Sequence, residues 1–347
     1  MKRARPGVFI LTAVLSAAVS ALTAIAAPSP DGVLYRVTAI EAVPGLGGEV
    51  TAINDRGDVV GQYTLPSRKT PHAFLWSRGR FIDLGTLGGT DSMATGVNDR
   101  LQVCGFSTTP SGVQHAFLWY RGRMKDLGTL GGRKSQAWAI NQAGDVAGNS
   151  DVYPNEKLQD AFLYQHGKMT DLGSLALGGS EEFGLNSRGE VVGISSDWFG
   201  NEHPFLYRRG HMMDLGTAGK KSCGSVYINN SGEIVGALDG SSSLYEHGSW
   251  RVLKVLKGPF GPGWATGINN RGVIWGTDID SHGNQVFFLD HGRNRPLRYL
   301  PGSGWDAFMP WAMNDAGEVV GWAHKKTGYY PVVGTPVAAK PGDHQGR

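Results

Sequence analysis

The sequence predicts an all-β fold, a seven-bladed β-propeller of four-stranded blades. Three observations lead to this prediction. A unit that is loosely of the form N-x-x-G-[D/E]-V-V-G occurs seven times, at spacings of 40 to 45 residues. The string HAFLWSRGRFIDLGTLGG, which begins at His72, returns from His115 with 15 of its 18 positions unchanged. The chain also contains 52 glycines, about twice the usual share, and they fall at regular places between short β-rich runs.

Each copy of the unit begins with an asparagine, and the copies together cover residues 49 to about 334. The seven positions are Asn54, Asn98, Asn141, Asn186, Asn229, Asn269 and Asn314. Asparagine and glycine supply the positive φ angles that tight hairpins need, so we interpret these asparagines as turn or capping residues. Four strands in 40 to 45 residues is the period of a propeller blade.

The second unit illustrates the four strands. Residues 92–98 (SMATGVN) form strand a and residues 102–107 (QVCGFS) form strand b after a tight turn. Residues 115–119 (HAFLW) form strand c, rich in aromatic and β-forming residues, and residues 123–128 (RMKDLG) form strand d. The hairpins a–b and c–d are short and uniform, whereas the b–c loops and the d–a connections vary.

The two ends of the repeat region complement each other. The seventh unit has strands a, b and c but no DLG strand, while residues 35–48 (YRVTAIEAVPGLGG) form an isolated strand d. We therefore expect one domain, residues 34–334, closed by the N-terminal strand in the last blade, with a flexible tail at 335–347. Closure of this kind leaves no open edge between the first and last blades. A β-solenoid is the alternative architecture.

The repeated strings resemble those of the HAF-repeat family of probable extracellular repeat proteins. The resemblance rests on HAFLW at His72 and His115, DAFLY at Asp160, HPFLY at His203 and the recurring DLGTLGG. It covers residues 34 to about 334 and implies an exported bacterial protein. It brings no established activity and no catalytic residues. Blades five to seven lack the histidine that opens strand c.

Histidine on strand c and aspartate on strand d occur together or are absent together in five blades. The pairs are His72 with Asp83, His115 with Asp126 and His203 with Asp214, whereas blades five and six have Ser241 with Val252 and Gln285 with Pro296. We interpret each pair as a structural imidazole–carboxylate hydrogen bond between neighbouring strands. A motif in three blades is more typical of scaffold than of one active site. Blade three has Asp160 beside Asp171, and these carboxylates repel unless one is protonated or solvent intervenes.

The two cysteines are predicted to remain unpaired. Cys104 stands where other copies have valine, which indicates a small buried hydrophobe. Cys223 lies in the loop that enters strand a, three blades away in a ring of seven. A disulfide requires Cα atoms within about 7 Å, so we expect none.

The varied b–c loops and d–a connections are the predicted binding region, since variable loops on a rigid scaffold are where binding usually resides. The candidate ligand-binding residues are Tyr153, Trp198, Trp264, Asp278, Asp280, His282 and Trp305. Aromatic rings together with carboxylates and amides suit a sugar. The stretch DIDSHGN from Asp278 begins like a calcium loop but lacks the later ligands. We expect no metal site, no cofactor and no catalytic residue set.

The N-terminus indicates export. Lys2, Arg3 and Arg5 precede an apolar stretch that ends in Ala24-Ile25-Ala26, the pattern of a signal peptide (1–26) cleaved after Ala26. An uncleaved membrane anchor is the alternative. Cleavage would leave 30 basic and 30 acidic residues, so the mature chain lacks the basic face that nucleic-acid binding needs.

We therefore expect a secreted or periplasmic monomer with no transmembrane segment in the mature chain. Its predicted function is that of a binding or interaction module for an unidentified ligand, a cell-surface or extracellular carbohydrate or protein. The alternative is an extracellular carbohydrate-active enzyme with carboxylates such as Asp197 and Asp278 at the channel mouth. Two carboxyl groups about 5–10 Å apart in one funnel would favour that alternative.

Overall fold

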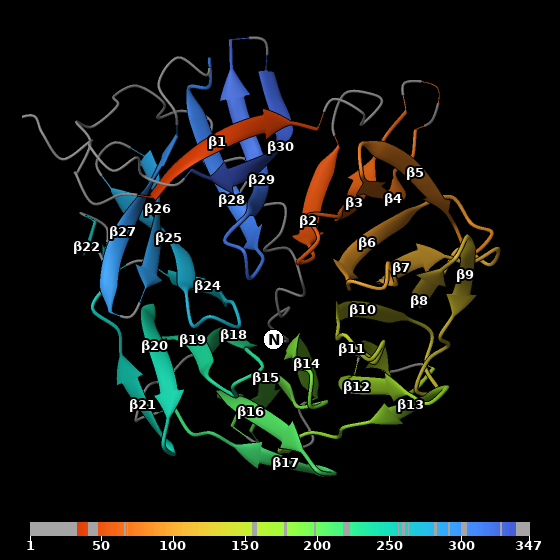
Figure 1. The fold of residues 1–347 in the computed structure, drawn as a ribbon. Coiled ribbons are helices and arrows are strands. Elements are labelled where there is room, and N and C mark those ends of the chain that lie inside the picture. The colour runs from red at the N-terminus through yellow and green to blue at the C-terminus, as the bar shows by residue number, and fades with distance from the viewer. Residues whose placement is uncertain are drawn as a thin grey trace, which may run out of the picture.

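The computed structural model shows seven four-stranded antiparallel blades arranged in a ring, a seven-bladed β-propeller (Figure 1). It describes residues 33–40, 48–65, 67, 69–154, 158–176, 179–197, 199–217, 223–255, 257–258, 261–262, 264–280, 283–290, 292–299, 304–326 and 328–337. The predicted signal segment, residues 1–26, lies outside this part of the chain. Among the described residues, no helix has the length and hydrophobicity needed to cross a membrane.

The first four blades follow the predicted order of strands, with strand a innermost. Blade one contains β2 (Glu49–Ile53), β3 (Val59–Tyr63), β4 (His72–Ser77) and β5 (Arg80–Gly85). Blade two contains β6 (Ser92–Val97), β7 (Val103–Thr108), β8 (Gln114–Tyr120) and β9 (Arg123–Asp126). Blade three contains β10 (Ser135–Ile140), β11 (Val146–Asp151), β12 (Gln159–Gln165) and β13 (Lys168–Asp171). Blade four contains β14 (Ser180–Leu185), β15 (Val191–Ser196), β16 (Glu202–Arg208) and β17 (His211–Asp214).

The remaining blades include one that takes a strand from the start of the chain. Blade five contains β18 (Cys223–Ile228), β19 (Ile234–Leu238), β20 (Ser241–Glu246) and β21 (Ser249–Val252), followed by the short pair β22 (Lys257–Gly258) and β23 (Gly261–Pro262). Blade six contains β24 (Trp264–Ile268), β25 (Ile274–Asp280), β26 (Gly283–Asp290) and β27 (Arg293–Tyr299). Blade seven contains β28 (Ala307–Met313), β29 (Val319–Lys325) and β30 (Gly328–Pro336), and β1 (Val33–Ala39) stands beside them.

The N-terminal strand β1 occupies the place that strand d has in the other blades. It pairs antiparallel with β30, with Tyr35 opposite Pro336 and Ala39 opposite Val332. On its other side β1 pairs parallel with β27, so blades six and seven share one eight-stranded sheet. Tyr35 is buried against Phe288 of β26, with ring centroids 5.9 Å apart, and its hydroxyl donates to the Gly317 carbonyl.

The apolar core lies between neighbouring blades rather than within one of them. A typical cluster joins Leu75 and Leu84 of blade one to Val97, Val103 and Phe117 of blade two. The phenylalanine of the HAF string is fully buried in each of the first four blades, at Phe74, Phe117, Phe162 and Phe205. Burying such a ring stabilises the fold by about 1.5–3 kcal/mol, which explains why the strings recur where blades must pack.

The last glycine of the V-V-G unit is required by a bulge in strand a. Each blade has a register shift on strand a, as between Ala94 and Gly96 in blade two. The bulge brings the Met93 carbonyl oxygen over Gly105 of strand b, where a Cβ atom would lie only 2.0 Å from that oxygen. Glycine is therefore the residue that permits this close approach.

Candidate functional site

Seven asparagines form a closed hydrogen-bonded ring around the propeller axis. The Nδ2 of each one donates to the backbone carbonyl oxygen of the next, over 2.9 to 3.3 Å, and the last bond runs from Asn314 to Asn54. The same side chain caps its own a–b hairpin. The Oδ1 of Asn186, for example, accepts the backbone N–H groups of Arg188 and Glu190. The capping role was predicted, whereas the bond from blade to blade was not.

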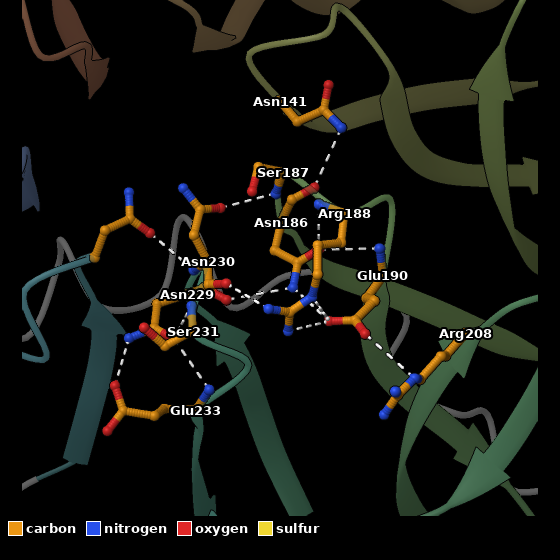
Figure 2. Close-up of polar contacts among 11 residues, drawn as sticks. Asn141, Asn186, Ser187, Arg188, Glu190, Arg208, Asn229, Asn230, Ser231 and Glu233 are labelled. Carbon is orange, nitrogen blue, oxygen red and sulfur yellow. Dashed lines mark hydrogen bonds and ion pairs between the residues drawn. The ribbon is translucent and has the colours of Figure 1, made fainter.

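Most of the asparagines also bind a side chain four residues later in the same hairpin. Asn186 donates to Glu190, and Asn229 donates to Glu233 in the same way (Figure 2). Arg188 and Arg208 also contact the Glu190 carboxylate, at 2.6 and 3.4 Å. Burial raises the pKa of Glu190, but the hydrogen bonds from Arg188 and Asn186 outweigh it, so the pKa lies below its usual range.

The residues on either side of each asparagine build a hollow of about 210 Å³ on the axis. The residues before the asparagines line it with an apolar collar of Ile53, Val97, Ile140, Leu185, Ile228, Ile268 and Met313. The residues after them form a polar rim of Asp55, Asp99, Gln142, Ser187, Asn230, Asn270 and Asp315. The hollow lies at the a–b hairpins, which the sequence predicted to be short and uniform, because strand a of every blade converges on the axis there.

The rim is itself hydrogen bonded and carries negative charge on one side. In six places the backbone N–H of one rim residue donates to the side-chain oxygen of the next, over 2.7 to 3.1 Å. Asp315, Asp55 and Asp99 follow one another around the axis. Burial raises the pKa of Asp55, the Asp315 N–H lowers it, and the charges of Asp315 and Asp99 raise it again, so that it lies above its usual value.

The asparagine ring is structural and has no hydrogen-bonding capacity left for a ligand. In Asn54 the Oδ1 accepts two backbone N–H groups, and the Nδ2 donates to Asp58 and to the Asn98 carbonyl. An amide side chain offers two donors and one oxygen with two lone pairs, so all four are in use. The hollow is the axis of the scaffold rather than a free amide site.

The opposite face, made by the b–c loops and the d–a connections, carries exposed aromatic side chains. Phe199 in the β15–β16 loop is 91% exposed, Trp264 at the start of β24 is 55%, Tyr153 in the β11–β12 loop is 52%, and Tyr329 on β30 is 46%. We call these four residues the loop-face aromatics. Tyr153 and Trp264 were predicted as ligand-binding residues. Phe199 and Tyr329 were not, although the WFG sequence of the β15–β16 loop was a signal for Phe199.

The loop that carries Phe199 is held in place by Asp197. The carboxylate of Asp197 accepts hydrogen bonds from the backbone N–H groups of Phe199 and Asn201 and from the Asn201 side chain, each over 2.8 Å. The Asn201 amide lowers the pKa of Asp197 most, with smaller effects from the two N–H groups and from His203. Asp197 therefore positions the loop, and its hydrogen bonds run within that loop.

The structure describes the other predicted ligand-binding residues to different extents. Trp198 and His282 lie outside the described residues, as do the side chains of Asp278 and Asp280. The backbone of Asp278 and Asp280 forms the β25–β26 hairpin, opposite Gln285 and Gly283. Trp305 is partly buried, donates from its indole nitrogen to the Val37 carbonyl and packs on Tyr330. Trp305 thus anchors β1 to blade seven.

The histidine–aspartate hydrogen bonds expected from the sequence are present in all three blades. The Nδ1 of His72, His115 and His203 lies 3.0, 2.8 and 3.0 Å from the carboxylates of Asp83, Asp126 and Asp214. Each aspartate also accepts the N–H of the glycine two residues later, as Asp126 does from Gly128. Each pair therefore links strand c to strand d and orders the turn that leads into the next blade.

Both cysteines are free and buried, as the spacing of the blades predicted. Burial raises the pKa of the Cys223 thiol to about 12, with a further contribution from the charge of Glu202. A thiol with such a pKa is protonated at neutral pH and is a poor nucleophile. Among the described residues, no group of three or more His, Cys, Asp and Glu side chains is placed to hold a metal ion.

Comparison with known proteins identifies the fold class. No family model and no curated protein sequence matches the chain. The chain is similar to the solved structure of virginiamycin B lyase from Staphylococcus aureus, at 12% identity and a TM-score of 0.57, over 87% of this chain and all of that one. It is also similar to the WD40 β-propeller domain of Doa1 at 13% identity, with a TM-score of 0.51 over 89% and 99% of the two chains.

A third similar structure is that of YCF48 bound to D1 peptide, at 10% identity and a TM-score of 0.50, over 90% and 98% of the two chains. At these identities the similarity shows a shared fold. The protein is a seven-bladed β-propeller.

Proposed function

We propose that this protein is an exported interaction module that binds a protein or peptide partner through the loop-face aromatics. The observation that carries the proposal is Phe199, a phenylalanine 91% exposed on a loop that Asp197 fixes with three hydrogen bonds. Exposing an apolar ring to water is unfavourable, and a partner that covers it recovers that free energy. A loop that is already ordered loses little entropy on binding.

The spread of the loop-face aromatics favours a large partner. They belong to blades three, four, six and seven, so a ligand in contact with all of them spans the ring. Aromatic residues are enriched among the contacts that dominate protein interfaces. The YCF48 structure, a propeller of similar fold bound to a peptide, supports a partner of this class. A glycan ligand, which the sequence also suggested, is the competing outcome of the test.

Export is the second part of the proposal and rests on the sequence of residues 1–26. The basic residues, the apolar stretch and Ala24-Ile25-Ala26 indicate a cleaved signal peptide and a secreted or periplasmic protein. The intact mass of the protein recovered outside the bacterial cytoplasm should correspond to a chain that begins at Ala27. An uncleaved chain in the membrane fraction would contradict export by this route.

The proposed binding surface predicts a specific loss on substitution. A phage-displayed random peptide library selected on the immobilised full chain should yield peptides that bind the wild-type protein. Phe199→Ser should weaken their Kd by about 10–30-fold, the loss typical of an anchoring aromatic. Val252→Ser is the matched control, because Val252 is 57% exposed but lies on β21, an outermost strand.

Two results of this experiment would contradict the proposal. One is peptides that bind the Phe199→Ser variant as tightly as the wild type. The other is the absence of selected peptides together with binding to a glycan array, which would favour a carbohydrate ligand. The enzyme alternative stays a prediction. Asp197 holds its own loop, and the side chain of Asp278, its suggested partner, lies outside the described residues.

A further inference from the structure

Blade three places a second carboxylate where blades one, two and four have an imidazole. In β12 and β13, Phe162 is opposite Asp171, just as Phe117 is opposite Asp126 in β8 and β9. Asp160 precedes Phe162 by two residues, as His115 precedes Phe117. Because the Nδ1 of His115 lies 2.8 Å from Asp126, the equivalent register brings the carboxylates of Asp160 and Asp171 to the same side of the two strands.

The Asp160 carboxylate is buried and lacks a hydrogen-bond partner at one oxygen. Asp160 is only 7% exposed. In the described part of the chain, its Oδ1 is one of two buried side-chain polar atoms without a partner, the other being the indole nitrogen of Trp275. Buried polar groups in proteins are almost always satisfied, so this oxygen indicates an interaction with something other than the chain.

The surroundings of Asp160 disfavour its ionised form. Burial raises its pKa to about 6, and the neighbouring Asp171 carboxylate contributes to the increase. A cation between the two side chains would offset the repulsion of their carboxylates.

We propose that Asp160 and Asp171 bind a calcium ion, which takes the place of the imidazole found in the other blades. The available ligands are carboxylate oxygens only, which hard cations such as Ca²⁺ prefer, whereas zinc and copper favour nitrogen and sulfur. Asp171 is exposed, and water reaches the remaining coordination positions from that side.

The carboxylate of Asp171, the second ligand of the site, is positioned by the fold. Asp171 accepts the N–H of Gly173 over 2.7 Å, the same contact that Asp126 makes with Gly128. This bond fixes the carboxylate at the end of β13. Two carboxylates and water give a weak site, with an expected Kd of about 10⁻⁴–10⁻³ M, as in extracellular calcium modules.

The test is thermal unfolding of the full chain at pH 7.5, with CaCl₂ as the probe. Relative to EDTA at matched ionic strength, 10 mM CaCl₂ should raise the Tm of the wild type by about 2–4 °C. Calorimetric titration should give one ion per chain. Asp160→Asn should abolish both the shift and the binding. Asp160→His restores the pair of the other blades and should be more stable than the wild type in EDTA and insensitive to calcium.

Three outcomes would overturn the proposal. In the first, the wild type shows no calcium shift but gains stability on acidification to pH 5, which would assign the positive charge to a proton. In the second, the calcium shift survives in Asp160→Asn, which would place the ion elsewhere. In the third, MgCl₂ produces the same shift as CaCl₂ in both proteins, which would indicate general screening.

Discussion

Replacing Asn186 by alanine should lower the free energy of unfolding by about 3–4 kcal/mol. The residue is 2% exposed, and its side chain makes four hydrogen bonds. The substitution leaves two hairpin N–H groups and the Asn229 carbonyl without partners, and each such buried group costs about 1–3 kcal/mol. Part of this free-energy cost is recovered where water enters the cavity that the truncated side chain leaves. Urea unfolding followed by tryptophan fluorescence measures the change.

Asn230→Ala is the matched control for this prediction. Asn230 follows the ring residue Asn229 and belongs to the rim, where its side-chain oxygen accepts the Ser187 N–H. We expect a loss below about 1 kcal/mol. Asn186→Asp keeps the oxygen that caps the hairpin but removes both Nδ2 donations, to Glu190 and to the Asn229 carbonyl, and sets a carboxylate against Glu190. We expect it to be destabilised although the cap is kept. Equal losses in Asn186→Ala and Asn230→Ala would contradict the structural role of the ring.

Replacing Tyr35 by alanine should cost about 3–5 kcal/mol, the usual loss for truncating a buried aromatic ring. Tyr35 is 2% exposed on β1, packs on Phe288 of blade six and donates its hydroxyl to Gly317 of blade seven. Burial also raises the pKa of its phenol above the usual value. The side chain thus joins the N-terminal strand to two blades, and urea unfolding should show a lower midpoint.

Two variants separate the contributions of Tyr35. Tyr35→Phe removes only the hydroxyl and should cost about 1 kcal/mol. Arg36→Ala alters the neighbouring exposed residue of the same strand and should change stability by less than about 0.5 kcal/mol. If Tyr35→Ala were as stable as Arg36→Ala, β1 would contribute nothing to the fold.

The order of strands within each blade could be predicted from the sequence because it depends on local chemistry. The turn residues after Asn98 and the aromatic run from His115 both act over a few residues. The pairing of His115 with Asp126 followed from their joint presence or absence in five blades. The absence of a disulfide between the two cysteines could be predicted by counting the blades that separate them.

The asparagine ring could not be predicted by reasoning about single hairpins, since its bonds join residues about 40 to 45 positions apart. A signal was nevertheless present. Asparagine occupies all seven positions, although a turn alone accepts aspartate or serine as well, and only an amide supplies both the oxygen for the turn and the donor for the next blade. The glycine of the same unit is less strict, since Leu101 takes its place with a φ of 59°.

The site was predicted less well than the fold. Variation in length and composition indicated the loop face, which carries the four loop-face aromatics, but it does not reveal how exposed each ring is. Trp305 was indistinguishable from Trp264 in sequence, yet one anchors β1 and the other is exposed. The axial hollow was missed because it arises where seven similar hairpins converge, and no single repeat contains it.

The N-terminal strand pairs with the last strand of the chain and so completes blade seven. Disulfide formation in a Thr38→Cys, Val333→Cys variant tests this pairing. These residues are directly opposite in the antiparallel pair of β1 and β30, a spacing that suits a disulfide. Mass spectrometry of the oxidised, folded protein should show a 38–333 link, and a Thr38→Cys, Ser249→Cys control should show none. A folded protein without the 38–333 link would contradict the account.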